Sequence, residues 1–223
     1  MPDLGAIIFD FDGVLLESEY EGNVELARLL TDYGHPHSVE DTLQTYIGLN
    51  GRDFIAAIEG RIGTQLPPEF HDRLKAMGVR ALRDGIEEVA GAVEFVRSLP
   101  AGLPKAVASS SSTRWILGHL DHLGLAGAFG SHIYSGREHV ERGKPAPDVY
   151  LHAAAQLGVP IVDCAIIEDS PVGATGALAS GARVIGFVAG EHCLDGHAER
   201  LAALGVKEIA NSFDEVRALL RLA

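Results

Sequence analysis

Short apolar runs that alternate with segments of helical period constrain the fold of this chain more than any other feature. The runs cover residues 6–9, 105–108, 131–134, 164–167 and 184–188. Segments with helical spacing lie between them, for example 91–99, 113–123 and 148–157. Short buried strands that alternate with helices are typical of a parallel sheet with helices on both faces. The sequence therefore predicts a Rossmann-like α/β core.

Residues 16–88 interrupt this alternation. They contain four helical stretches and no convincing strand after the first run, and the stretches are 20–33, 38–46, 51–61 and 69–84. We interpret them as an inserted α-helical cap domain, with the α/β core formed by 1–15 and 89–223. The alternative is one long irregular crossover, which the rarity of long structureless loops disfavours. Ser18 and Glu21 are spaced as a capping box, and Ser170-Pro171 and Gly181 are typical of the two ends of a helix.

Charge and cysteine content exclude several classes of function. The chain of 223 residues carries 31 acidic and 18 basic residues, a net charge of -13. Such an excess disfavours nucleic acid and anionic membranes, because both are polyanions. Two cysteines, Cys164 and Cys193, are too few for a disulfide scaffold. We see no signal peptide or membrane span and expect a soluble, cytoplasmic protein.

Polar side chains follow the predicted strands, where ligands bind in α/β sheets. They are Asp10 and Asp12, then Ser109 and Ser110, then Lys144, and finally Glu168 and Asp169. If adjacent strands bring them together, they form an acidic cluster with one cation and small hydroxyls. That combination suits Mg²⁺, which binds one or two carboxylates together with water and substrate phosphate.

Each of these residues also has an ordinary structural interpretation. Asp10 and Asp12 could simply cap a strand–helix turn. Alternatively, one carboxylate could attack phosphorus while the other transfers a proton. Gly13 would then allow the chain to turn sharply. Ser109 could be a loop serine or bind a phosphate. Lys144 could be a surface lysine or neutralise a phosphoryl group. Glu168 and Asp169 could cap the next helix, although their position after an apolar strand favours a metal site.

Other catalytic motifs are missing from the sequence. Gly173-x-x-Gly176 is not a dinucleotide fingerprint, because it falls inside a predicted helix and not before one. The histidines show no His-Glu-x-x-His pattern, so zinc hydrolysis lacks support. We interpret most of them as helix-surface residues, for example His119, His122 and His152.

The order of the polar motifs resembles that of the haloacid dehalogenase superfamily, in its phosphatase and phosphomutase branch with a helical cap. The resemblance spans essentially the whole chain, and it is carried by DFDGVLLESE (10–19), VASSSS (107–112), GKPAPDVY (143–150) and IIEDSPVGATGA (166–177). Each motif alone is moderately specific, but the ordered set is highly specific.

The resemblance implies a role for each residue at the strand ends. Asp10 would be the nucleophile and a Mg²⁺ ligand, and Asp12 the general acid and base with its main-chain carbonyl on the metal. Ser109 would bind the phosphoryl group, and Lys144 would link that group to the nucleophile. Asp169 would bind Mg²⁺ directly. Glu168 would either bind the metal as well or hydrogen-bond to the groups that do. Because dehalogenases need no acid at the position of Asp12, its presence favours phosphate chemistry.

The sequence departs from the family pattern at two places. Glu17 stands where many relatives carry Asp, and the serine run 109–112 lacks the Asn often found there. In the predicted cap, residues 47–53 resemble a loop in which relatives of β-phosphoglucomutase carry a substrate-binding arginine. Arg52 could therefore contact an anionic substrate group, or it could be a surface arginine. Ser110 is a further candidate for phosphate binding.

These observations favour a Mg²⁺-dependent phosphatase that acts on a small phosphorylated metabolite, of the sugar or sugar-acid phosphate class. A β-phosphoglucomutase-like isomerase is the alternative, and a non-catalytic protein that binds a phosphorylated metabolite is a third. We expect a monomer or a weak homodimer. The acidity does not argue against an anionic substrate if the carboxylates gather a divalent cation.

Overall fold

The computed structural model describes residues 4–47, 49 and 51–222 of the chain. It divides into two compact units, Met1–Glu17 with Glu87–Ala223 and Ser18–Ile86. The boundaries expected from the sequence lie within two residues of these at each junction. The first unit is the α/β core, and the second consists of helices.

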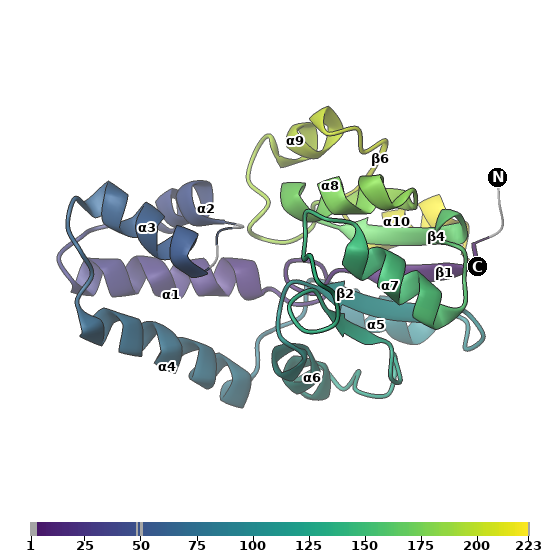
Figure 1. Ribbon diagram of the computed structural model, residues 1–223, viewed down its shortest axis with the longest axis horizontal. Helices are drawn as coiled ribbons and strands as arrows, with labels where there is room; N and C mark the ends of the chain where they lie inside the picture. The colour runs from purple at the N-terminus through teal and green to yellow at the C-terminus, as the bar shows by residue number, and fades with distance from the viewer. Residues whose placement is uncertain (1–3, 48, 50, 223) are drawn as a thin grey trace. The chain divides into compact units, whose positions relative to one another are not determined.

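The core unit contains a parallel six-stranded sheet within the described residues (Figure 1). The strands run in the order β3-β2-β1-β4-β5-β6. Their bounds are β1 Ala6–Phe9, β2 Lys105–Ser109, β3 Ile133–Ser135, β4 Cys164–Glu168, β5 Arg183–Phe187 and β6 Glu208–Ala210. Strand β1 lies between β2 and β4, so the carboxyl ends of these three strands are neighbours. This order confirms the Rossmann-like α/β core.

Helices cover both faces of the sheet, because successive side chains of each buried strand point to opposite faces. One face packs against α7 Asp148–Leu157, α8 Pro171–Ser180 and α9 His197–Ala203, with Ile8 and Ile166 in the shared core. On the other face Phe9 packs edge-to-face on Phe95 of α5 Ala92–Ser98. Phe95 in turn stacks on Phe213 of α10 Phe213–Leu220. Helix α6 Thr113–His122 follows β2.

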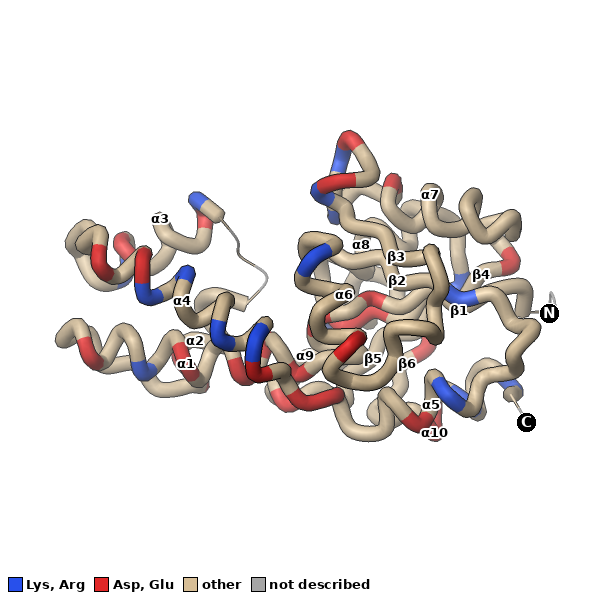
Figure 2. Tube along the Cα trace, turned by 90° about the horizontal axis from the view of Figure 1, so that it is seen from below, with Lys and Arg blue, Asp and Glu red and all other residues tan. Residues whose placement is uncertain are grey.

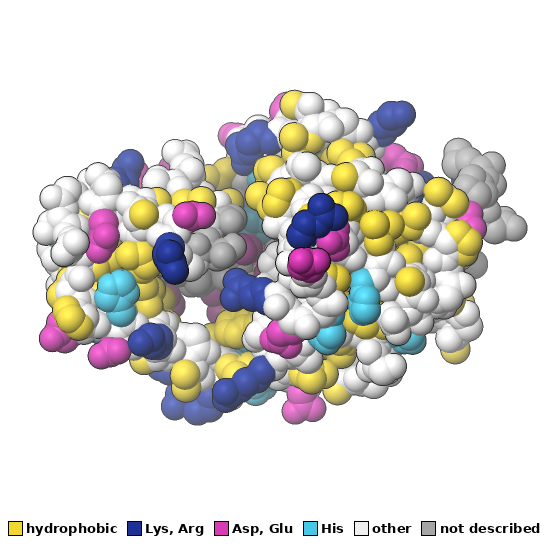
Figure 3. Space-filling model, in the orientation of Figure 1, with side chains coloured by type: hydrophobic (Ala, Val, Ile, Leu, Met, Phe, Trp, Pro, Cys, Tyr) yellow, Lys and Arg dark blue, Asp and Glu magenta, His cyan; other side chains and the backbone are white. Residues whose placement is uncertain are grey.

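The second unit is built from four helices with their own apolar core. They are α1 Ser18–Asp32, α2 Val39–Tyr46, α3 Gly51–Ile62 and α4 Pro68–Asp84. Leu30, Ile58 and Phe70 are fully buried there. Acidic and basic residues are interspersed along these helices (Figure 2), and Arg73 pairs with Asp32 at 2.9 Å. Charged side chains of both signs also dot the visible face of each unit (Figure 3).

The structure corrects several details of the sequence interpretation. The third strand begins at Ile133, two residues later than predicted, and β6 was not predicted because it is a three-residue edge strand with only Ala210 buried. Helix α1 begins at Ser18, two residues before the predicted start, and a complete capping box that was not predicted joins Ser38 and Asp41 at α2. Helix α8 begins and ends as predicted, after Ser170 and before Gly181.

One histidine prediction was wrong. His119 is fully buried, and its ring packs edge-on against Trp115 with centroids 4.2 Å apart. His119 lies three residues after the buried Ile116 and beside the buried Leu120, so the helical period places it on the buried face of α6, a signal that the sequence interpretation missed.

Among the described residues, no helix is long and apolar enough to cross a membrane.

Glycines in helices provide a test of the packing. Gly78 in α4 is exposed, and a Cβ there would meet no atom within 4 Å. Gly176 in α8 faces the main chain before α7, where a Cβ would lie 2.9 Å from the Ala146 carbonyl oxygen. We expect Gly78→Ala to stabilise the protein by about 0.5–1 kcal/mol, since alanine is the better helix former. Gly176→Ala should destabilise it by about 1–3 kcal/mol through overpacking. Urea unfolding followed by circular dichroism measures both, and equal effects would contradict the packing described here.

Candidate active site

The polar residues that follow β1, β2 and β4 lie side by side because these strands are neighbours in a parallel sheet. Asp10 directly follows β1, Ser109 ends β2 and Glu168 ends β4. All three are almost completely buried, with exposures of 6%, 1% and 0%. The carboxyl edge of the sheet is therefore where the chemistry-bearing side chains converge, as the sequence predicted.

Lys144 lies between two of these carboxylates. Its Nζ is 2.9 Å from Asp10 Oδ1 and 2.7 Å from Glu168 Oε1, and its side chain is only 3% exposed. The loop that carries Lys144 lies against helix α8, and Gly176 allows that close approach. Lys144 is therefore a buried cation of the site and not the surface lysine that the sequence alone left open.

Glu168 holds this lysine in place. Its Oε1 accepts hydrogen bonds from Lys144 and from the hydroxyl of Tyr150 at 2.9 Å. Its Oε2 accepts from the main-chain N–H and the hydroxyl of Ser170 at 2.8 and 3.1 Å. Gly173 makes room for the carboxylate, since a Cβ there would overlap Oε1 at 1.6 Å. Sequence reasoning missed Tyr150, although it ends the third motif.

Asp169 offers a carboxylate oxygen for a cation. Its Oδ2 is 2.8 Å from Nε2 of His192, whereas its buried Oδ1 has no hydrogen-bond partner in the described part of the chain. Ligand oxygens of Asp10, Glu168 and Asp169 lie within 4.8 Å of one another. Hard carboxylate oxygens around an unsatisfied buried oxygen fit Mg²⁺.

Burial and charge shift the pKa values of these groups. Burial raises the pKa of Asp10 well above its ordinary value, and Glu168 and Asp169 add to the rise while Lys144 opposes it. Burial alone would lower the pKa of Lys144, but Asp10 and Glu168 raise it, so the lysine stays charged. Burial also raises the pKa of Asp169, against the hydrogen bond from His192. A bound cation would favour the ionised carboxylates that this site needs.

Asp12 accepts hydrogen bonds from the loop and helix that follow β2. Its Oδ2 lies 2.6 Å from the hydroxyl of Ser111 and 3.3 Å from that of Ser109. Its Oδ1 accepts from the indole N–H of Trp115 at 2.9 Å. Ser111 was not predicted although it lies in the motif at 107–112, and Trp115 was not predicted because no motif marks it. Only the turn into α6 brings them to this carboxylate.

Gly13 is required by the turn after Asp12. Its φ is +80°, and a Cβ there would lie 2.2 Å from Asp169 Oδ2. The residue thus combines a left-handed backbone with the close approach of two loops, as the sequence predicted for a sharp turn.

Two predicted substrate contacts stay predictions. Arg52 is an exposed residue at the start of α3 in the helical unit, and Ser110 is half-buried in the loop after β2. Gly48 and Asn50, which belong to the predicted substrate loop, lie outside the described residues.

Known proteins with similar sequences include a family of hydrolases and several phosphatases. A family model described as haloacid dehalogenase-like hydrolase matches residues 4–181. The phosphorylated carbohydrates phosphatase of Thermotoga maritima is 30% identical over 224 residues, covering 95% of this chain and 99% of that protein. The fructose-1-phosphate phosphatase of Escherichia coli is 32% identical over 179 residues, covering 78% and 92%.

A solved structure shares the whole fold. The haloacid dehalogenase family hydrolase from Deinococcus radiodurans, crystallised with bound phosphate and sodium, has a TM-score of 0.86 and 32% identity. The match covers 99% of this chain and 96% of that one. This protein is therefore an enzyme that belongs to the haloacid dehalogenase-like hydrolase family.

Proposed function

We propose that this protein is a Mg²⁺-dependent phosphatase that hydrolyses a small phosphorylated metabolite, of the sugar or sugar-acid phosphate class. The observation that carries the proposal is the buried contact of Lys144 with Asp10, beside the unsatisfied oxygen of Asp169. Such a site presents a carboxylate nucleophile, a fixed positive charge and room for a hard cation at one point. The names of the relatives, which are phosphatases of sugar phosphates, support the substrate class.

Asp10 would act as the nucleophile. One of its carboxylate oxygens attacks phosphorus, the bond from phosphorus to the leaving oxygen breaks, and Asp12 gives that oxygen a proton. Asp12 then takes a proton from water, the water oxygen attacks phosphorus, and the bond to Asp10 breaks. Inorganic phosphate leaves, and both aspartates return to their starting states.

The remaining residues would supply binding and charge. Lys144 would neutralise the transferring phosphoryl group, and the hydroxyl of Ser109 would bind one of its oxygens. Ser110 and Arg52 are further candidates for substrate contacts. Mg²⁺, when bound, supplies positive charge that offsets the carboxylates and the phosphoryl oxygens.

Asp10, Asp169 and the main-chain carbonyl of Asp12 would hold Mg²⁺. Glu168 would contribute mainly through Lys144, because both its oxygens already accept hydrogen bonds. The helical unit would serve as a cap that excludes water during the first step.

Phosphate release from a panel of sugar phosphates and p-nitrophenyl phosphate tests this function. We expect turnover with Mg²⁺ and none with EDTA, and we expect Asp10→Asn to lower kcat by about 10⁴-fold because the nucleophile is lost. Asp121→Asn is the matched control, since it makes the same change at an exposed position of α6. Isomerisation of a sugar phosphate without phosphate release would instead indicate a mutase.

The contact between Trp115 and Asp12 gives a second test, because Trp115 is the only tryptophan of the chain. We expect Asp12→Ala to change the tryptophan emission spectrum, and Asp12→Asn to lower kcat by about 10²–10⁴-fold through loss of the acid and base. Trp115→Phe should cost about tenfold in kcat/KM, since it removes a hydrogen bond that orients the carboxyl group of Asp12. Because asparagine keeps an oxygen that can accept the indole N–H, an Asp12→Ala emission spectrum identical to that of the wild type is the result that would contradict the contact.

A further inference from the structure

The segment that leaves β5 and enters α9 supplies two imidazoles to a single residue of the site, His192 from the loop and His197 from the first position of α9. His192 Nε2 lies 2.8 Å from Asp169 Oδ2, and His197 Nε2 lies 2.6 Å from the main-chain oxygen of Asp169. Both histidines are buried, with exposures of 2% and 4%. The two bonds thus hold the side chain and the main chain of Asp169 at once.

The bonding partners fix which nitrogen of His197 carries hydrogen. A carbonyl oxygen only accepts, so Nε2 must donate to Asp169. A guanidinium only donates, so Nδ1 must accept from Arg200, which lies 3.0 Å away. His197 is therefore held from both sides of its ring.

Packing fixes the ring of His192 as well. A Cβ on Gly13 would lie 2.8 Å from its Cε1, and a Cβ on Gly190 would lie 2.6 Å from the same atom. The neighbouring main-chain N–H of Glu191 donates to both carboxylate oxygens of Glu17, at 3.2 and 3.3 Å. The loop is thereby attached to the segment that follows β1, and the two glycines lie directly against the ring of His192.

We propose that His192 and His197 are positioning residues, which orient Asp169 so that its Oδ1 faces the divalent cation. The inference rests on the proposed function above. Oδ2 is taken by His192, whereas Oδ1 has no hydrogen-bond partner among residues 4–47, 49 and 51–222. In many metal sites, residues that hydrogen-bond to the metal ligands orient those ligands in this way. Removal of such a residue weakens metal binding.

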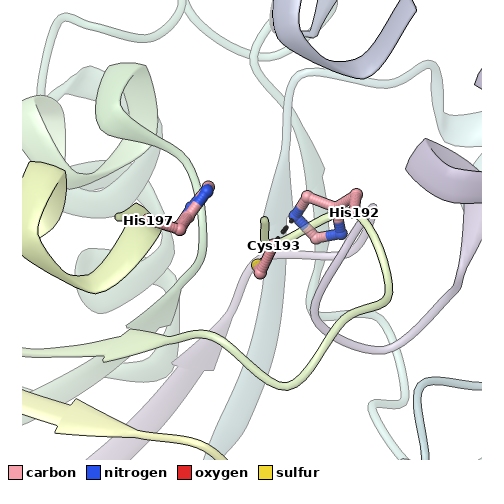
Figure 4. Close-up of side chains that lie close together, drawn as sticks. All are labelled: His192, Cys193 and His197. Atoms are coloured by element: carbon pink, nitrogen blue, oxygen red, sulfur yellow. Dashed lines mark hydrogen bonds between the residues drawn. The ribbon is translucent and has the colours of Figure 1, made fainter. Parts of the chain in front are cut away.

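The cluster has an alternative use as a site for a soft metal. Figure 4 shows Cys193 between the two histidines, with its Sγ 3.3 Å from His192 Nε2. Ligand atoms of these three residues lie within 4.8 Å of one another, and zinc and similar ions bind such sets. However, Nε2 of each histidine already bonds to Asp169, and a metal that bound these nitrogens would break both bonds. The observed contacts therefore favour the positioning role.

Mn²⁺ binding, measured by electron paramagnetic resonance of the free ion, tests the proposal without turnover. His192→Gln keeps an N–H donor, and His192→Met has similar length without one. We expect His192→Met to weaken Mn²⁺ binding about 10–100-fold, and His192→Gln to stay within about threefold of the wild type. Equal affinities in the wild type and His192→Met would overturn the inference. Thermal unfolding without metal checks that each variant is folded.

The same pair of changes at His197 keeps the test valid if a variant at position 192 does not fold. His197→Met should weaken Mn²⁺ binding more than His197→Gln does, because only the glutamine can donate to the Asp169 carbonyl. Equal Mn²⁺ affinities of folded His197→Met and wild type would overturn the role of His197.

Co²⁺ absorption separates the positioning role from a soft-metal site. We expect no thiolate-to-cobalt band in the wild type, and Cys193→Ser should leave Mn²⁺ affinity unchanged. A Co²⁺ band that disappears in Cys193→Ser would overturn the inference in favour of a soft-metal site. A wild type that binds no Mn²⁺ would overturn the proposed metal dependence together with this inference, whereas a defect confined to catalysis with intact Mn²⁺ binding would contradict the proposed function alone.

Discussion

The rest of the site depends on the ion pairs that the buried ammonium group of Lys144 makes with Asp10 and Glu168. Asp10, Glu168 and Asp169 bring three carboxylates into a region almost without solvent. Uncompensated buried charges of one sign are costly, so the carboxylates require a cation at their centre. Lys144 provides one charge and is held by direct contacts with Asp10 and Glu168. The remaining negative charge is what makes the site suitable for a divalent cation.

The surroundings of this lysine explain several otherwise unremarkable residues. Tyr150 and Ser170 satisfy the oxygens of Glu168, so that carboxylate is fixed before any ligand binds. Gly173 and Gly176 lie on one face of α8 and let it approach the carboxylate and the main chain beside Lys144. The glycine pair that does not fit a nucleotide-binding motif therefore has a packing function. Part of the acidic net charge is likewise concentrated at this edge of the sheet, in the carboxylates of Asp10, Glu168 and Asp169.

Residues that belong to local patterns could be predicted from the sequence, and residues that reach the site over long distances could not. Asp10, Glu168 and Asp169 directly follow or end apolar strands, so their place at the carboxyl edge follows from the parallel sheet. Trp115 and His192 lie outside such patterns. Trp115 contacts Asp12, which lies 103 residues away in the sequence. His192 contacts Asp169 only because two loops meet at the sheet edge.

The sequence by itself determined the alternation of strands and helices, the helical insertion and the set of strand-end groups, because these depend on hydrophobic period and on local turn chemistry. Only the tertiary structure decided that Lys144 is buried, that Glu168 accepts a hydrogen bond from this lysine, and that two histidines contact Asp169. The physical reason is that hydrogen bonds and burial depend on which loops meet at the sheet edge. Strand order, which places β1 between β2 and β4, decides that meeting.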